Sequence, residues 1–211
     1  PGDVYKRQPP YSFFSKKDYK SLYESSSRAD REELYRWIEY YKIKFKSRVY
    51  TPLNNSEKYT LVLMGRADFG LLGSYNKYKQ TPFETFHVGG DGMTGSYTYA
   101  TETIGLRGYD NGALTPYSDG RAYTRFSMEL HFPFLLQPSS TIYGLAFVEG
   151  GNAWTSLENF NPFSLKRSAG VGVRIFLPMI GLMGIDWAYG FDKVQGEKGG
   201  GHFHFILGQE F

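Results

Sequence analysis

The chain has 211 residues, with 18 Tyr, 17 Phe and 25 Gly, no Cys and a formal net charge of +3. No run approaches the roughly 18 to 20 apolar residues of a membrane-spanning helix, and the charge is too small to indicate nucleic-acid binding. Without cysteine, disulfides and thiol chemistry are excluded. Because the chain is aromatic and yet has a mean hydropathy of -0.43, two classes remain: a soluble all-β fold, or a transmembrane β-barrel with apolar residues at every second position.

The first 36 residues are predicted to be a truncated strand end followed by a long polar loop. They are rich in Ser, Lys, Tyr and Pro and show no sustained period, although Asp30–Trp37 could form one or two helical turns. The first ten residues lack the apolar core of a secretory signal, so we expect an exported protein to begin further upstream. The main domain is assigned to residues 37–211.

Alternation of polar and apolar residues predicts about seven strands. Over Tyr40–Val49 and Tyr59–Leu71, ionisable side chains lie on one face and aromatic or aliphatic side chains on the other. These runs of about 12 residues are longer than most globular strands and close to the length of a strand that crosses a membrane. After a gap of more than 40 residues, further alternating runs follow at 125–132, 141–154, 168–175, 183–190 and 202–207.

The lengths of the connections favour an outer-membrane barrel. Short turns are predicted near Pro52, Pro138 and Pro178, and longer segments lie at the opposite end, including a loop over residues 77–120. The apolar face is crowded with Phe, Tyr and Leu, whereas the other face carries small and charged residues; a soluble sandwich has the reverse arrangement. We therefore predict an all-β fold, a transmembrane antiparallel barrel. Because seven strands are too few for closure, we expect the C-terminal half of a larger barrel.

Two further motifs are interpreted as structural. Gly90–Gly95 has the glycine spacing of a dinucleotide fingerprint, but no βαβ unit surrounds it, so we interpret it as a turn within the long loop. His202 and His204 share one face of the last predicted strand, without a third metal ligand at a suitable spacing. The sequence therefore predicts neither a cofactor nor a metal site.

One arginine and two carboxylates are the candidate functional residues. Arg107 lies between Gly105 and Gly108, which would permit a sharp turn. Glu129 and Glu149 lie on the polar faces of neighbouring predicted strands. We interpret these carboxylates as partners of a cation, and a guanidinium with five donors can satisfy both. The alternative is a carboxylate pair for acid–base catalysis.

The chain resembles the BamA-type family of outer-membrane insertases over about residues 35–211. Leu106-Arg107-Gly108-Tyr109 is similar to the Val-Arg-Gly-Phe tip of the sixth extracellular loop in that family, and Phe83–Gly90 resembles an earlier part of the same loop. The runs similar to the twelfth, thirteenth, fourteenth and last strands are 127–130, 147–154, 168–173 and 203–211. This combination is more specific than any single motif.

The resemblance implies a barrel of about sixteen strands, preceded by periplasmic POTRA domains, that folds and inserts other barrel proteins into the outer membrane. It further implies that the sixth loop folds into the lumen and is locked there by its tip, with Arg107 paired to Glu129 and Glu149. In this interpretation the locking motif consists of Leu106, Arg107, Gly108 and Tyr109.

The resemblance also implies a weak seam between the first and last strands. The seam residues in the last strand would be Phe203, Phe205, Gly208 and Phe211, with a kink at Gly208. The implied partners are the outer-membrane bilayer, unfolded outer-membrane proteins as clients and accessory lipoproteins of a Bam-type complex, with no nucleic acid and no cofactor. The alternatives are a TamA-like assembly factor, a two-partner secretion transporter or an outer-membrane enzyme that uses Glu129 and Glu149.

Overall fold

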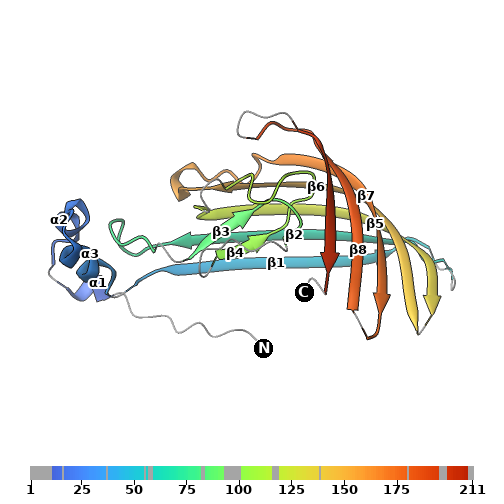
Figure 1. The fold of residues 1–211 in the computed structure, drawn as a ribbon, viewed down its shortest axis with the longest axis horizontal. Coiled ribbons are helices and arrows are strands. Elements are labelled where there is room, and N and C mark those ends of the chain that lie inside the picture. The colour runs from blue at the N-terminus through green and yellow to red at the C-terminus, as the bar shows by residue number, and fades with distance from the viewer. Residues whose placement is uncertain are drawn as a thin grey trace.

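The main feature of the fold is a strongly curved antiparallel sheet of seven strands (Figure 1). The computed structural model describes residues 11–15, 17–36, 38–54, 56, 59–81, 84–92, 101–115, 119–137, 139–179, 181–194 and 199–208. The strands, in their order across the sheet, are β1 (Tyr41–Pro52), β2 (Val62–Gly73), β5 (Ala122–Gln137), β6 (Ser140–Trp154), β7 (Lys166–Leu177), β8 (Gly181–Gly190) and β9 (Gly201–Leu207). Among the described residues the sheet is open, with β1 and β9 at its edges.

The seven strands predicted by alternation are confirmed, but β5 is longer than predicted. The alternating run in the sequence covers residues 125–132, and Pro133 follows it. In the structure β5 continues to Gln137, with a register shift between Pro133 and Leu135. A β-bulge of this kind accommodates the proline and lets the strand bend.

The two faces of the sheet differ in chemistry, as the alternation predicts. Large apolar side chains are exposed on the convex face; they include Ile43, Phe45, Val49, Phe134, Val148, Val171, Trp187, Phe203 and Phe205. The concave face carries buried charged groups, including Asp68, Arg125, Glu129, Glu149, Arg174 and Asp186. A sheet with apolar side chains outside and charges inside is suited to lipid on its convex face.

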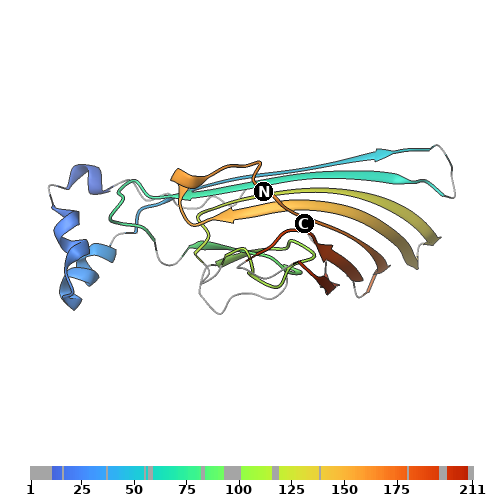
Figure 2. The same cartoon turned by 90° about the horizontal axis from the view of Figure 1, so that it is seen from above.

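The long loop between β2 and β5 contains a small sheet that sequence analysis did not predict. Strands β3 (Thr85–Val88) and β4 (Thr101–Ile104) pair in parallel and lie on the concave side of the large sheet (Figures 1 and 2). The loop packs against the large sheet in a shared apolar core, in which Phe86, Val88 and Leu106 of the loop are fully buried beside Leu72 of β2 and Tyr123 of β5. Strands of four residues lie at the lower limit of the length at which alternation indicates a strand.

Helices precede β1, where mainly a polar loop was predicted. They are α1 (Tyr11–Phe14), α2 (Tyr19–Glu24) and α3 (Arg28–Tyr35), and only α3 corresponds to the predicted helical turns. A buried ion pair joins this region to the segment after β2, since Lys79 Nζ lies 3.2 Å from Glu39 Oε1. A short 3₁₀ turn over Leu157–Asn159 lies between β6 and β7. Among the described residues, no helix is long and apolar enough to cross a membrane.

Candidate functional site

The tip of the long loop contacts five strands of the concave face. Gly105 accepts a hydrogen bond through its carbonyl from Arg125 of β5, at 2.6 Å. Arg107 contacts β5, β6 and β8 through its guanidinium. Gly108 donates its N–H to a side chain of β9, and the Tyr109 hydroxyl donates to a carbonyl of β7. The tip is therefore held by hydrogen bonds from β5 to the last strand.

Arg107 is the centre of a cluster of charged side chains, which we call the lumen cluster: Arg107, Glu129, Glu149, Arg174 and Asp186. Arg107 Nη2 donates to Glu149 Oε1 at 2.5 Å and also to Glu129, while Nη1 donates to Asp186 Oδ2 at 2.9 Å. The backbone N–H of Arg107 donates to Glu149 Oε2 at 3.0 Å. Arg174 completes the cluster by donating through Nη2 to Asp186 at 2.7 Å.

The lumen cluster is buried, so each of its charges needs an opposite charge beside it. Arg107 has 8% of its surface exposed and its guanidinium carbon lies 3.5 Å from the ring centroid of Phe147, within the range of a cation–π contact. Burial lowers the pKa of Arg107, but the charges of Glu149 and Glu129 outweigh burial, and the pKa lies well above its usual value. The guanidinium therefore stays charged, and buried carboxylates that lost it would be left uncompensated.

The strand register and the glycines of β7 bring these groups together. Glu129 faces Phe147 across the β5–β6 ladder, and Glu149 faces Ser127, so both carboxylates lie on the concave face. On β7, Gly172 leaves the space that the side chain of Asp186 occupies, because a Cβ there would lie 1.7 Å from Asp186 Oδ1. A larger residue at position 172 would displace the third carboxylate.

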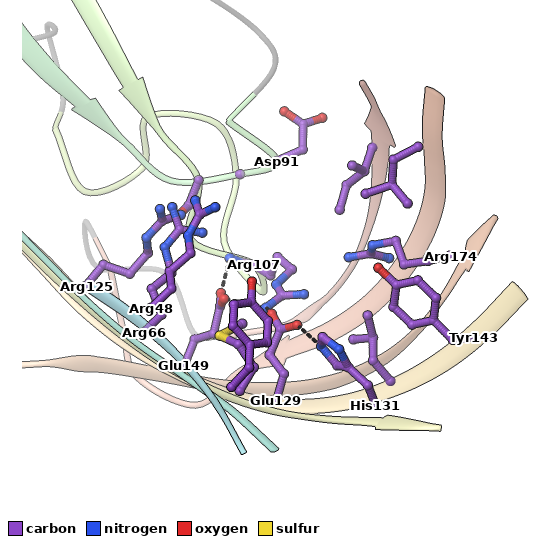
Figure 3. Close-up of a pocket in the computed structure, with 17 residues that line it drawn as sticks. Arg48, Arg66, Asp91, Arg107, Arg125, Glu129, His131, Tyr143, Glu149 and Arg174 are labelled. Carbon is purple, nitrogen blue, oxygen red and sulfur yellow. Dashed lines mark hydrogen bonds and ion pairs between the residues drawn. The ribbon is translucent and has the colours of Figure 1, made fainter. Parts of the chain in front are cut away.

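A cavity of about 120 Å³ lies beside the tip and the lumen cluster (Figure 3). Its lining includes both glutamates of the cluster together with His131, whose Nε2 lies 2.9 Å from Glu129 Oε2. Three basic side chains from neighbouring strands, Arg48, Arg66 and Arg125, lie close together on another side (Figure 3). The cavity is polar and charged, unlike the apolar pocket that encloses most small ligands.

Gly108 fits its position for two reasons. Its φ of +87° lies in the left-handed region, which favours glycine. A Cβ at this position would also lie 2.7 Å from Cβ of Ser168 and 3.0 Å from the backbone nitrogen of Gly190. Gly105 has no positive φ, but a Cβ there would lie 3.1 Å from the backbone of Asp91. Both glycines allow a close backbone approach. Of the two, Gly108 also has a positive φ, which favours glycine.

Two members of the lumen cluster, Arg174 and Asp186, were not among the candidate residues predicted from the sequence. Both occupy the polar face in the alternating pattern of their strands, so the sequence does indicate on which face of the sheet their side chains lie. The pattern does not give the register between β7 and β8, however, and without it no distance between Asp186 and Arg107 can be inferred. Only the strand pairing in the structure places the third carboxylate, Asp186, beside Arg107.

Of the predicted seam residues, Phe203 and Phe205 belong to β9 and Gly208 follows it. Phe203 and Phe205 are exposed on the convex face, with 70% and 57% of their surfaces accessible. Gly208 follows the strand with a φ of +93°, and its N–H donates to the carbonyl of Leu182 at 2.8 Å. Phe211 lies outside the described residues. Gly208 therefore has a left-handed backbone conformation, and the inward kink at this position stays a prediction.

The two histidines of β9 contact the loop tip. His204 Nε2 accepts the hydrogen bond from the N–H of Gly108 at 2.9 Å, and His202 Nδ1 lies 3.2 Å from Asp110 Oδ1. Among the described residues, no group of three or more His, Cys, Asp or Glu side chains could hold a metal ion. Of the Gly90–Gly95 motif, Gly90 forms a bridge with Leu106, and residues 93–95 lie outside the described part of the chain.

Salt bridges on β1 form a second attachment of the loop. Lys42 Nζ lies 2.8 Å from Glu84 Oε2 and 3.1 Å from Glu102 Oε2, and Lys44 Nζ lies 3.1 Å from the same Glu102 oxygen. Glu102 belongs to β4, and Glu84 precedes β3. Alternation predicted that these lysines share one face but could not identify their partners in the loop.

Comparisons with known proteins agree with this architecture. The sequence pattern described as the Omp85 superfamily domain matches residues 26–211. Among solved structures, the crystal structure of BamA from Haemophilus ducreyi lacking POTRA domains 1–3 is similar, with a TM-score of 0.56 and 20% sequence identity. The match covers 80% of this chain and 35% of that structure, so the chain spans about a third of the length of the BamA chain.

These matches confirm two of the predictions made from the sequence. The fold is the predicted antiparallel sheet of an outer-membrane barrel, and the location is the outer membrane. The predicted boundary at residue 36 stays a prediction; the family match begins at residue 26, within the segment that contains α2 and α3.

Proposed function

The chain belongs to the Omp85 superfamily, and from this premise we propose that it acts in the BamA manner, folding and inserting β-barrel proteins into the outer membrane through a lateral seam. The observation that carries the proposal is the docked loop tip. Arg107 is the centre of a buried cluster on the concave face, and the tip reaches from β5 to β9. The cluster holds the loop inside the curved sheet without any catalytic group.

The proposed mechanism depends on the outer edge of β9, which in this proposal meets the first strand of the full-length barrel in a short, weak seam. Among the described residues, β9 is hydrogen-bonded to β8 alone, over seven residue pairs. Unpaired backbone N–H and C=O groups are costly in lipid, so such an edge is a template for an incoming strand. Client strands would add to it by β-augmentation. In this proposal Phe203 and Phe205 face lipid beside the seam, and Gly208 provides the turn at its end.

The proposed partners follow from this mechanism. Unfolded outer-membrane proteins are the clients, POTRA domains precede the barrel, and accessory lipoproteins complete the assembly. Within the superfamily the alternatives are a TamA-like assembly factor and a two-partner secretion transporter. A secretion transporter differs from an insertase in that its cargo does not remain in the membrane. Enzymatic use of Glu129 and Glu149 is disfavoured because both carboxylates are engaged by Arg107 and Ser127 or His131.

Replacement of Arg107 tests the role of the tip. In the full-length protein, Arg107→Ala should reduce the assembly of outer-membrane proteins, measured by cell growth and by heat-modifiable gel mobility of newly made barrels. Arg167→Ala is the matched control, because Arg167 also pairs with a carboxylate, Asp192, but is mostly exposed. Normal client assembly by Arg107→Ala, with the variant inserted at wild-type levels, would contradict the proposed role.

A disulfide between β9 and the first barrel strand of the full-length protein tests the seam. The sequence contains no cysteine, so an engineered pair has no competing thiol within it. Oxidation should stop insertion of clients, and reduction should restore it. Secretion of a soluble cargo that stops with the tether, while barrel insertion continues, would favour the transporter alternative.

A further inference from the structure

Strand β9 contacts the loop tip through its inward-facing side chains, and this contact is separate from the lumen cluster. Within the described chain, β9 has seven residues and pairs with β8. In Figure 1 it is the dark red strand at the edge of the sheet. Its inward-facing side chains add contacts with the loop to this strand pairing.

The central contact is the hydrogen bond from the backbone N–H of Gly108 to Nε2 of His204. Its length is 2.9 Å, and His204 has 5% of its surface exposed. Because Nε2 is the acceptor, the imidazole is neutral and carries its proton on Nδ1. A buried amide that lost this acceptor would be costly, since an unsatisfied donor retains its full desolvation penalty.

Both sides of this hydrogen bond are fixed by other groups. On the loop side, Gly108 lies between Arg107, which is held by the lumen cluster, and Tyr109, whose hydroxyl donates to the carbonyl of Arg167 at 2.6 Å. On the strand side, His204 faces Asp186 across the β8–β9 ladder. Asp186 is itself a partner of Arg107. The loop tip, the lumen cluster and β9 therefore meet within one buried region.

A neighbouring contact offers a control on the same face of the strand. His202 stacks near His204, with ring centroids 6.2 Å apart, and its Nδ1 lies 3.2 Å from Asp110 Oδ1. The carboxylate-bearing side chain of Asp110 is 83% exposed, so water competes for this contact. The two histidines thus touch adjacent parts of the loop, but only His204 binds a buried backbone donor.

We propose that His204 is a positioning residue that couples the docked loop tip to β9. Undocking of the tip removes the donor that holds the strand, and displacement of the strand removes the acceptor that holds the tip. Because coupling between two sites is reciprocal, each event promotes the other. The inference rests on the proposed function, in that β9 forms one side of the lateral seam; it adds that release of the loop and opening of the seam are linked through one hydrogen bond.

A double-mutant cycle measured by amide hydrogen exchange tests the coupling in the full-length protein. Arg107→Ala should raise the exchange of the β9 amides by about 5-fold, the factor that corresponds to a typical net hydrogen bond. In the His204→Leu background, Arg107→Ala should add little to the exchange of β9, because the connection is already broken. His204→Gln should keep the coupling, since the glutamine carbonyl is an acceptor near the position of Nε2. His202→Leu is the control and should also keep it.

The outcomes separate this inference from the proposed function. If Arg107→Ala raises the exchange of β9 equally with and without His204→Leu, or if only His202→Leu abolishes the effect, His204 is not the coupling residue. Heat-modifiable mobility identifies folded variants, and if His204→Leu does not fold, loss of coupling in His204→Gln would overturn the proposal. Client assembly is measured in parallel. Retained assembly without coupling would leave the proposed function intact and overturn this inference, whereas coupling without assembly would leave this inference intact and contradict the proposed function.

Discussion

Gly108 and Gly190 approach so closely that a Cβ on Gly190 would lie 2.3 Å from the carbonyl oxygen of Gly108. The same hypothetical atom would lie 3.0 Å from the ring of Tyr109. The backbone of the loop tip therefore packs directly on the end of β8, without side chains between them. This contact brings Arg107 near enough to Asp186 for a direct hydrogen bond, and it makes the site sensitive to very small additions of volume.

Substitution of Gly108 should destabilise the docked loop strongly. Gly108→Ala combines an unfavourable positive φ, at about 1 to 2 kcal/mol, with overpacking, at about 1 to 3 kcal/mol. We expect a loss of roughly 2 to 5 kcal/mol in the free energy of unfolding, measured by urea unfolding of the full-length protein in detergent. Gly65→Ala on β2 is the control, since a Cβ there meets nothing within 4 Å and its φ is not positive. Equal losses in the two variants would contradict the close-packing argument.

Neutralisation of Asp186 should leave two arginines without their shared partner. Asp186 accepts from both Arg107 and Arg174 and is fully buried. Breaking a buried ion pair from one side typically costs about 3 to 5 kcal/mol, so Asp186→Asn should lower the urea midpoint clearly. Adding Arg174→Gln should recover part of the loss, because it removes one uncompensated charge. Asp192→Asn, at the exposed pair with Arg167, should change the midpoint little. A further decrease on adding Arg174→Gln would show that Asp186 does not act by charge balance.

The sequence predicts the strands of this protein well, because alternation depends on local spacing alone. It also identifies Glu129 and Glu149, which lie on the polar faces of predicted strands, and Arg107, which lies between two glycines of the long loop. Resemblance to a family added the expectation that the loop enters the lumen. The position of that loop depends on contacts between residues such as Arg107 and Asp186, 79 positions apart in the chain.

Features that depend on strand register or on short segments could not be predicted in this way. Glu102 is the partner of both Lys42 and Lys44, and it lies in β4, a strand of four residues that pairs in parallel with β3. The hydrogen bond between His204 and Gly108 uses a backbone N–H, which has no sequence signal. A lumen-facing histidine is equally consistent with a wet interior, so only the geometry shows what it contacts.

The attachment of the loop to β1 should weaken at low pH. Burial raises the pKa of Glu102, but Lys42 and Lys44 outweigh burial, and the pKa lies below its usual value. A carboxyl group with a lowered folded-state pKa stabilises the fold above its unfolded pKa, about 4.3, and this stabilisation is lost as the pH falls through the folded value. The difference in unfolding free energy between wild type and Glu102→Gln should therefore be constant near neutral pH and shrink below about pH 4. A difference that grows on acidification would contradict this assignment. The control substitution is Glu158→Gln, at an exposed side chain.

The hydroxyl of Tyr109 should contribute modestly. It donates to the carbonyl of Arg167 at 2.6 Å, while the ring itself is buried in the apolar core between the loop and the large sheet. Tyr109→Phe keeps the ring and removes one hydrogen bond, so we expect a loss of about 1 kcal/mol and retained client assembly. Tyr109→Ala removes the ring as well, and should cost about 3 to 5 kcal/mol. Equal unfolding midpoints for these two variants would mean that the ring does not anchor the tip.

Gly208 and Gly108 share a positive φ but differ in their surroundings, and this difference predicts different consequences for substitution. A Cβ at Gly208 meets nothing within 4 Å, so Gly208→Ala has the conformational cost, about 1 to 2 kcal/mol, without a steric clash. We expect the protein to fold and to insert normally. Because the turn after β9 is disfavoured, the rate of client assembly in reconstituted vesicles should fall. Gly208→Asn should retain more activity than Gly208→Ala, since asparagine tolerates positive φ better than other non-glycine residues. If Gly208→Ala assembled clients at the wild-type rate, the turn at Gly208 would not contribute to the seam.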